Sequence, residues 1–131
     1  MRPLVWLWER DAYWRGLLTE LLEEAFTVRQ CSGVATVWKD LLAGDTGVLI
    51  ADFTRLTSLG FADRARLSSL SSLTPVLLLV EDPAIAHAAD TEAGRSSVLF
   101  NPFEDLDRLL AAAVELSRLT ATVGTRALSA F

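Results

Sequence analysis

The stretch Val48-Leu49-Ile50-Ala51-Asp52 decides the fold of this chain. Four consecutive apolar residues are typical of a strand that is buried on both faces of a parallel sheet. In such sheets, ligands and chemistry gather at the carboxyl ends of the strands. A second apolar run, Leu4-Val5-Trp6-Leu7-Trp8, also ends in a carboxylate, Glu9. We therefore expect Glu9 and Asp52 to converge at one edge of a single sheet.

Apolar runs recur along the chain and alternate with segments of helical periodicity. The expected strands cover residues 4–8, 26–31, 48–51, 76–80 and 98–100. The clearest helical face is formed by Trp14, Leu17, Leu18, Leu21, Leu22 and Ala25, and further helices are expected at 34–42, 61–73, 84–93 and 106–116. This alternation predicts an α/β fold, a doubly wound five-stranded parallel sheet with helices on both faces.

Length, charge and cysteine content limit the possible roles. The 131 residues suit one domain, predicted at 1–119, and 120–131 loses periodicity and is a helix extension, a tail or the start of a linker. A net charge of −5 with scattered basic residues argues against nucleic-acid binding through this domain. No apolar run approaches the roughly 20 residues of a membrane span. Cys31 is the sole cysteine and the N-terminus lacks a secretory pattern, so a cytoplasmic location is expected.

Across about residues 4 to 118, the chain resembles the receiver (CheY-like) domain of bacterial response regulators. Asp52 falls at the phospho-acceptor position of that family, and Gly60 follows eight residues later, where the family has its loop glycine. The stretch from Gly94 to Phe103 has the spacing of the family's Gly-to-Lys-Pro-Phe segment. The resemblance implies a flavodoxin-like fold with strand order 2-1-3-4-5, and a cis peptide bond before Pro102.

The resemblance also shows which functional groups of the family are replaced. A receiver uses two acidic residues that hold Mg²⁺, a switch hydroxyl, a switch aromatic residue and a lysine. The corresponding positions here are Glu9 and Arg10, Val80, Val98 and Asn101. Each lost donor is commonly worth on the order of 3 kcal/mol of transition-state stabilisation. We therefore expect phosphorylation of Asp52 to be weak or absent, and no cofactor, with Glu9 and Asp52 as the residual ligands of a weak or absent Mg²⁺ site.

Arg10 has two readings that the sequence leaves open. Its guanidinium would either occupy the vacated metal site and pair with Asp52 or Glu9, or remain a solvated loop side chain.

The resulting hypothesis is an atypical receiver-like signalling domain of a two-component or phosphorelay-type system. It is not an enzyme, and it acts on a protein partner of a signalling pathway. A homodimer through the fourth helix, fifth strand and fifth helix is possible, with an interaction surface of Asp105, Asp107, Arg108, Glu115 and Arg118. One alternative is a slow but genuine phospho-acceptor that uses Asp52. A second is a small-molecule or nucleotide-binding flavodoxin-like module, against which stands Glu9-Arg10-Asp11-Ala12 where a Gly-rich phosphate loop would follow the first strand.

Overall fold

The computed structural model describes residues 2–54, 60–89 and 96–129, and its centre is one parallel sheet of five strands. The strands are β1 (Leu4–Trp8), β2 (Thr27–Cys31), β3 (Gly47–Asp52), β4 (Val76–Val80) and β5 (Ser96–Phe100). Their order in the sheet is β2-β1-β3-β4-β5, which confirms the expected topology. From β1 the chain adds β2 on one side and then β3, β4 and β5 on the other, so the strand order reverses between β1 and β3. In parallel sheets, ligands bind at the carboxyl ends of the strands at this point.

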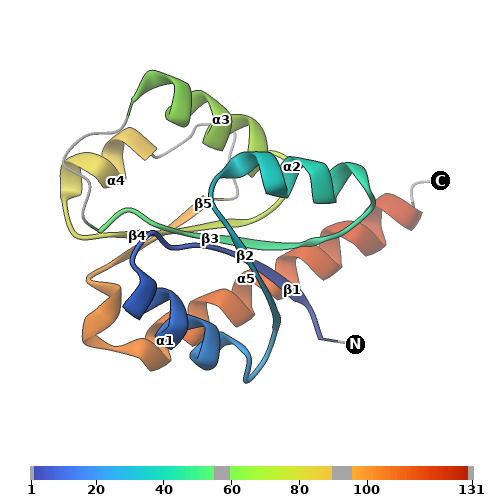
Figure 1. Ribbon diagram of the computed structural model, residues 1–131. Helices are drawn as coiled ribbons and strands as arrows, with labels where there is room; N and C mark the ends of the chain where they lie inside the picture. The colour runs from blue at the N-terminus through green and yellow to red at the C-terminus, as the bar shows by residue number, and fades with distance from the viewer. Residues whose placement is uncertain (1, 55–59, 90–95, 130–131) are drawn as a thin grey trace.

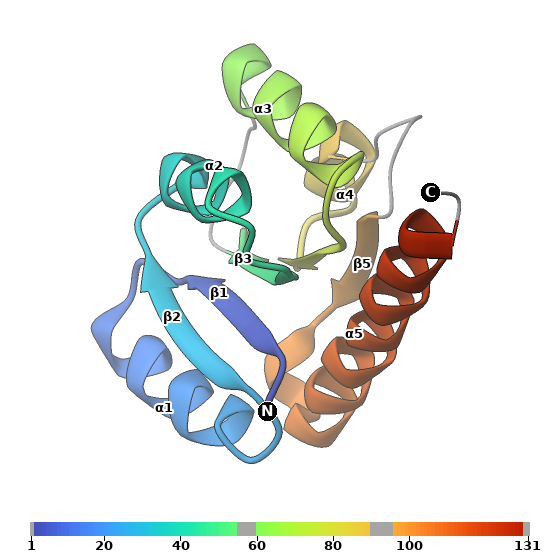
Figure 2. The same ribbon diagram turned by 90° about the vertical axis from the view of Figure 1, so that its right-hand side faces the viewer.

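Helices cover both faces of the sheet (Figures 1 and 2). The helices are α1 (Ala12–Leu22), α2 (Val34–Leu42), α3 (Phe61–Ser71), α4 (Pro83–Ala89) and α5 (Leu106–Ser129). α1 and α5 lie on one face, and α2, α3 and α4 lie on the other (Figure 2). The helix expected at 84–93 begins at Pro83, a favourable first position for proline, and the residues after Ala89 in that range lie outside the described part of the chain.

The core consists of two apolar layers that the sheet separates. Alternate residues of the central strands point to opposite faces, so Trp6 and Leu78 pack in the layer under α2, α3 and α4. Val5 and Leu77 pack in the layer under α1 and α5. Every residue of β3 and β4 is buried, in keeping with the continuous apolar runs 48–51 and 76–80. The edge strand β2 is mostly exposed or half-buried.

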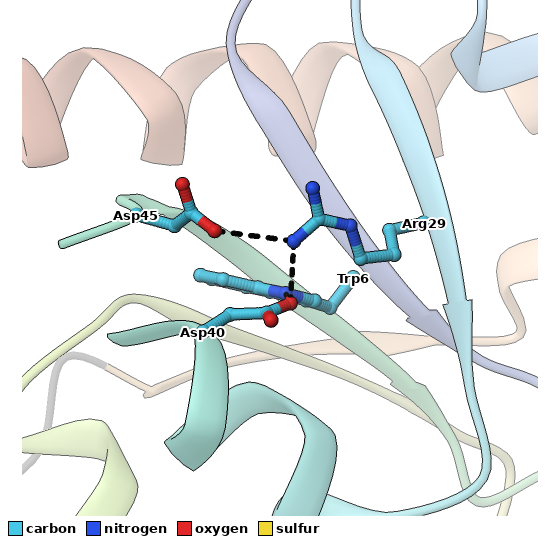
Figure 3. A network of polar contacts seen from close by, with 4 residues as sticks. All are labelled: Trp6, Arg29, Asp40 and Asp45. Atoms are coloured by element: carbon cyan, nitrogen blue, oxygen red, sulfur yellow. Dashed lines mark hydrogen bonds and ion pairs between the residues drawn. The ribbon is translucent and has the colours of Figure 1, made fainter. Parts of the chain in front are cut away.

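A network of polar contacts joins side chains of β1, β2 and α2 (Figure 3). The indole Nε1 of the fully buried Trp6 donates a hydrogen bond to Asp40 Oδ2 at 2.8 Å. Arg29 Nη1 lies 2.6 Å from the same oxygen and 3.2 Å from Asp45 Oδ2. The Trp6 indole and then the Arg29 guanidinium hold the pKa of Asp40 below its ordinary value. The indole N–H of the buried Trp6 therefore has a hydrogen-bond partner.

α5 is longer than the periodicity of its sequence predicts. Its 24 residues continue to Ser129, so 120–129 is helical, one of the three options that the sequence left open. At 1.5 Å per residue the helix measures about 36 Å, roughly twice the length of a five-residue strand. The domain boundary at residue 119 stays a prediction. Among the helices of the described segments, none combines the length and the apolar character that crossing a membrane requires.

Candidate functional site

The sheet register brings Glu9 and Asp52 to the same edge. Trp8 pairs with Ala51 across β1 and β3, so the residue that follows each lies at the carboxyl end of neighbouring strands. Both carboxylates are buried, with exposed fractions of 3% for Glu9 and 8% for Asp52. Buried carboxylates at a topological switch point are a strong candidate for a functional site.

Each carboxylate bonds to the loop that follows its own strand. Glu9 Oε1 accepts a hydrogen bond from the Asp11 amide at 2.9 Å, and Asp52 Oδ1 accepts one from the Thr54 amide at 2.9 Å. These are short-range contacts in which an acidic side chain closes a turn. The hydroxyl of Thr54 is buried and has no hydrogen-bond partner in the described part of the chain.

The β1–α1 loop is organised by Arg15, which the sequence analysis did not single out. Arg15 Nε donates to the Glu9 carbonyl at 3.1 Å, and Nη2 donates to the Arg10 carbonyl at 3.2 Å. Asp11 then caps α1 by accepting from the Trp14 amide at 3.1 Å. The sequence feature that could have indicated this role is the position of Arg15 in the first turn of α1, because a long side chain there reaches back to the preceding loop.

Arg10 does not occupy the site between the two carboxylates, so the first of its two readings is wrong. Its side chain is exposed, and its guanidinium carbon lies 5.3 Å from the ring centroid of Trp8. In the described part of the chain, Glu9 and Asp52 each accept a hydrogen bond from an amide of the loop after their own strand, and Arg10 is placed against the Trp8 ring. On the Trp8 face the guanidinium keeps most of its hydration and gains a cation–π contact, whereas entering the buried site would require full desolvation.

The positions of the switch hydroxyl and the switch aromatic residue that the resemblance implies lie at the end of β4 and in the middle of β5. Val80 is fully buried and accepts, through its carbonyl, a hydrogen bond from the Asn101 amide at 2.9 Å. Val98 pairs with Leu78 and is half-buried. Neither valine provides a hydroxyl or an aromatic ring.

The peptide bond before Pro102 is trans, so the expected cis bond is wrong. Asn101 has φ 48° and ψ 56°, the left-handed conformation that asparagine tolerates better than most residues. The chain reverses through this residue, and Pro102 then begins a short 3-10 helix, Pro102–Glu104. Phe103 stacks on Trp14 of α1 with ring centroids 4.1 Å apart, which fixes the end of the turn.

The residues of the predicted interaction surface are exposed along α5 and before it, at Asp105, Asp107, Arg108, Glu115 and Arg118. Two of their interactions are local. Asp105 Oδ1 accepts from the Arg108 amide at 3.3 Å, and Arg118 Nη1 lies 3.3 Å from Glu115 Oε2. Exposed ion pairs of this kind contribute only about 0 to 1 kcal/mol.

The acidic set at this edge is smaller than the one that the resemblance to receivers implies for Mg²⁺. In the described segments, no three acidic, histidine or cysteine side chains gather closely enough to hold a metal. Glu9 and Asp52 are the carboxylates that end β1 and β3, and the second acidic position of a receiver is here the cationic Arg10. Mg²⁺ requires near-ideal octahedral coordination by oxygen, and neighbouring guanidinium groups oppose its charge.

No protein-family model matches this chain, and no curated protein matches it either. Solved structures do match. The response regulator StyR is 21% identical with a TM-score of 0.72, covering 98% of this chain and 66% of that one. The fold is the receiver fold.

Two receiver domains of similar length match over nearly their whole chains. The signal receiver domain of an HD domain-containing protein from Pseudomonas fluorescens Pf-5 is 20% identical with a TM-score of 0.72, covering 95% of this chain and 93% of that one. A CheY-like response regulator receiver domain protein from Methanospirillum hungatei JF-1 is 16% identical with a TM-score of 0.67, covering 93% and 99%. At these identities the likeness concerns the fold.

Proposed function

We propose that this chain is an atypical receiver-like signalling domain of a two-component or phosphorelay-type system, which acts through protein–protein contact. The observation that carries the proposal is the edge at which β1 and β3 end. Asp52 lies there, buried beside Glu9 in a sheet of receiver topology. A buried acidic pair at the switch point supports descent from a phospho-accepting site, because folding alone does not require carboxylates in a buried position.

The groups that would stabilise a phosphoryl transfer are replaced around Asp52. Val80 ends β4 with a buried side chain that has no hydroxyl, and Asn101 is uncharged and exposed. Arg10 lies on the Trp8 ring and away from the carboxylates. Few preorganised donors would therefore stabilise the negative charge of a phosphoryl group during its transfer to Asp52. This supports weak or absent phosphorylation.

We expect no stable phosphate on Asp52 after incubation with acetyl phosphate and Mg²⁺. Intact mass spectrometry measures this directly, with an active receiver domain treated in parallel as a positive control. The Asp52→Asn variant is the matched negative control, because asparagine keeps an oxygen that accepts the Thr54 amide. A mass gain of one phosphate that disappears in Asp52→Asn would establish the alternative, a slow but genuine phospho-acceptor.

The proposal includes a homodimer that forms through the surface made by α4, β5 and α5. Phe100 at the end of β5 is 44% exposed and Leu119 of α5 is 49% exposed, so β5 and α5 each carry an exposed large apolar side chain. In a two-fold dimer, acids such as Asp107 of one copy would face arginines such as Arg108 of the other. Apolar burial would supply most of the affinity, because exposed ion pairs contribute little.

Sedimentation equilibrium at micromolar concentration tests this surface. We expect a monomer–dimer equilibrium that Phe100→Ser shifts toward monomer by about tenfold in dissociation constant, the effect of losing one apolar contact at an interface centre. Leu42→Ser is the matched control, since Leu42 is 84% exposed at the end of α2, which packs against β2 at the opposite edge of the sheet from β5. A strict monomer, or equal effects of the two variants, would refute α4, β5 and α5 as the dimer surface.

The proposal also covers the partner classes and the compartment. The acidic chain, with a net charge of −5, argues against nucleic acid as its ligand. A nucleotide-binding role is disfavoured because the loop after β1 presents Glu9 and Asp11 in place of a glycine-rich phosphate cradle. Cys31 is a free thiol, in keeping with a reducing cytoplasm.

A further inference from the structure

A groove of about 650 Å³ lies at the end of the sheet where the strands begin. Its lining includes Leu4 and Thr27, the first residues of β1 and β2, and Thr46, which directly precedes β3. Because the strands are parallel, Glu9 and Asp52 stand at the opposite end of the sheet. A groove of this volume is of the size that small-molecule ligands occupy. It is therefore separate from the site around Asp52.

Three guanidinium groups line this groove, and they come from three separate parts of the chain. Arg2 precedes β1, Arg29 lies on β2 and Arg118 lies on α5. One carboxylate, that of Asp45, shares the lining, and Glu115 pairs with Arg118 at 3.3 Å. Positive charge therefore prevails among the lining side chains, although the whole chain has a net charge of −5. A groove with this excess of positive charge attracts anions.

Arg29 is held in place by two carboxylates that use only one of its nitrogens. Asp40 Oδ2 and Asp45 Oδ2 both bond to Nη1, at 2.6 and 3.2 Å. Figure 3 shows the other terminal nitrogen directed away from both carboxylates. Within the described part of the chain, the bonds that Arg29 makes through its side chain all involve Nη1, and this side chain is 44% exposed. Nε and Nη2 form the edge through which a guanidinium binds an oxyanion in two parallel hydrogen bonds.

The turn after α2 places both carboxylates at that one nitrogen. Gly44 has φ 96°, a conformation that glycine adopts without strain, and the chain reverses there between α2 and β3. The Asp45 amide then donates to the Asp40 carbonyl at 3.0 Å, which holds the two aspartates together. Arg29 is thus oriented before any ligand arrives, so binding costs little side-chain entropy.

We propose that this groove binds a small molecule through a phosphate or carboxylate group, with the Nε–Nη2 edge of Arg29 as the main contact. Arg2 adds charge at the same groove. Its Nη1 donates to the neutral carbonyl of Glu23, so that bond does not offset the charge of the guanidinium. Pro3 and Leu4 provide apolar surface for the body of the ligand. This site needs no chemistry at Asp52, so its failure would leave the proposed function untouched.

The test is a titration of the unmodified protein with inorganic phosphate and, separately, with succinate, each at constant ionic strength. Nuclear magnetic resonance follows the Nε–H signal of Arg29. We expect a saturable shift with a millimolar dissociation constant for at least one of the two anions. A response to phosphate alone would assign a phosphate-bearing ligand, and a response to succinate alone would assign a carboxylate-bearing one. If neither anion gives a saturable shift, the proposal is overturned.

Variants of Arg29 locate the binding, with the backbone amides of Thr27 and Asp45 as the signals that are followed. Arg29→Gln is expected to weaken binding of the responding anion by about tenfold, the effect of losing one charge-assisted contact. Arg29→Lys keeps the charge beside Asp40 but lacks the two parallel donors, so it should also weaken binding. Arg64→Gln, which removes an exposed arginine of α3, is the matched control and should change nothing.

Arg29→Lys keeps the test decisive where Arg29→Gln does not fold, because lysine can still pair with the two aspartates. Circular dichroism shows which variants are folded. Equal affinity for the anion in a folded Arg29 variant and in Arg64→Gln would refute Arg29 as the main contact of the groove.

Discussion

Replacing Gly47 with alanine is expected to destabilise the domain by about 3 kcal/mol, the upper end of what overpacking costs. Gly47 begins β3 and pairs with Leu4 of β1. A Cβ at this position would clash with the Leu4 carbonyl oxygen, and it would lie 3.1 Å from a ring carbon of Trp6. The oxygen belongs to the backbone of the neighbouring strand, so the contact is relieved only if β1 and β3 move apart.

Gly16→Ala is the matched control for this substitution. Gly16 lies inside α1, is exposed, and has no atom within 4 Å of an added Cβ. The same chemical change there should stabilise the domain by up to about 1 kcal/mol, because alanine favours a helix more than glycine does. Urea denaturation followed by circular dichroism measures both effects. Equal midpoints for Gly47→Ala and the unmodified protein would contradict the tight approach of β1 and β3.

The sheet was predictable from the sequence because burial on both faces leaves a plain signature. The runs 4–8, 48–51 and 76–80 are uninterrupted and apolar. A carboxylate, Glu9 or Asp52, directly follows the first two runs. Because burying a charge is costly, a carboxylate next to a buried strand indicates the end of that strand. The strand order was not contained in periodicity and came from the resemblance to receivers. The edge strand β2, Thr27–Cys31, has a weaker pattern because only part of it is buried.

The details of the site were less predictable because they depend on local geometry. Two environments were open to Arg10, the site beside the carboxylates and the solvent. Its guanidinium lies over the Trp8 ring because burial would cost its hydration, and the spacing of residues in the sequence does not show that cost. The left-handed conformation of Asn101 replaces a cis bond as the means of turning the chain, and both solutions suit an Asn-Pro sequence. Arg15 was overlooked because its partners are backbone carbonyls, which leave no trace in a pattern of side chains.

Trp6→Phe is expected to destabilise the domain by about 2 kcal/mol from lost packing alone, since the indole is fully buried and a smaller ring leaves a cavity. The variant also removes the indole N–H that donates to Asp40 Oδ2 at 2.8 Å. This donor is the largest cause that lowers the pKa of Asp40, so the pKa of this carboxyl should rise toward its ordinary value in the variant.

The pH dependence of the Trp6→Phe effect separates the hydrogen bond from the packing. A carboxyl whose pKa is lowered by folding stabilises the folded state above its unfolded pKa, and this contribution disappears as pH falls through the folded pKa. The stability difference between Trp6→Phe and the unmodified protein should therefore be largest near neutral pH and should narrow on acidification below the ordinary range of aspartate. Trp38→Phe, a change at a half-buried tryptophan of α2 in the same core layer, should give a smaller difference that stays constant with pH. Thermal or urea unfolding at several pH values measures both variants, and a Trp6→Phe difference that does not vary with pH would show that Asp40 gains nothing from the indole.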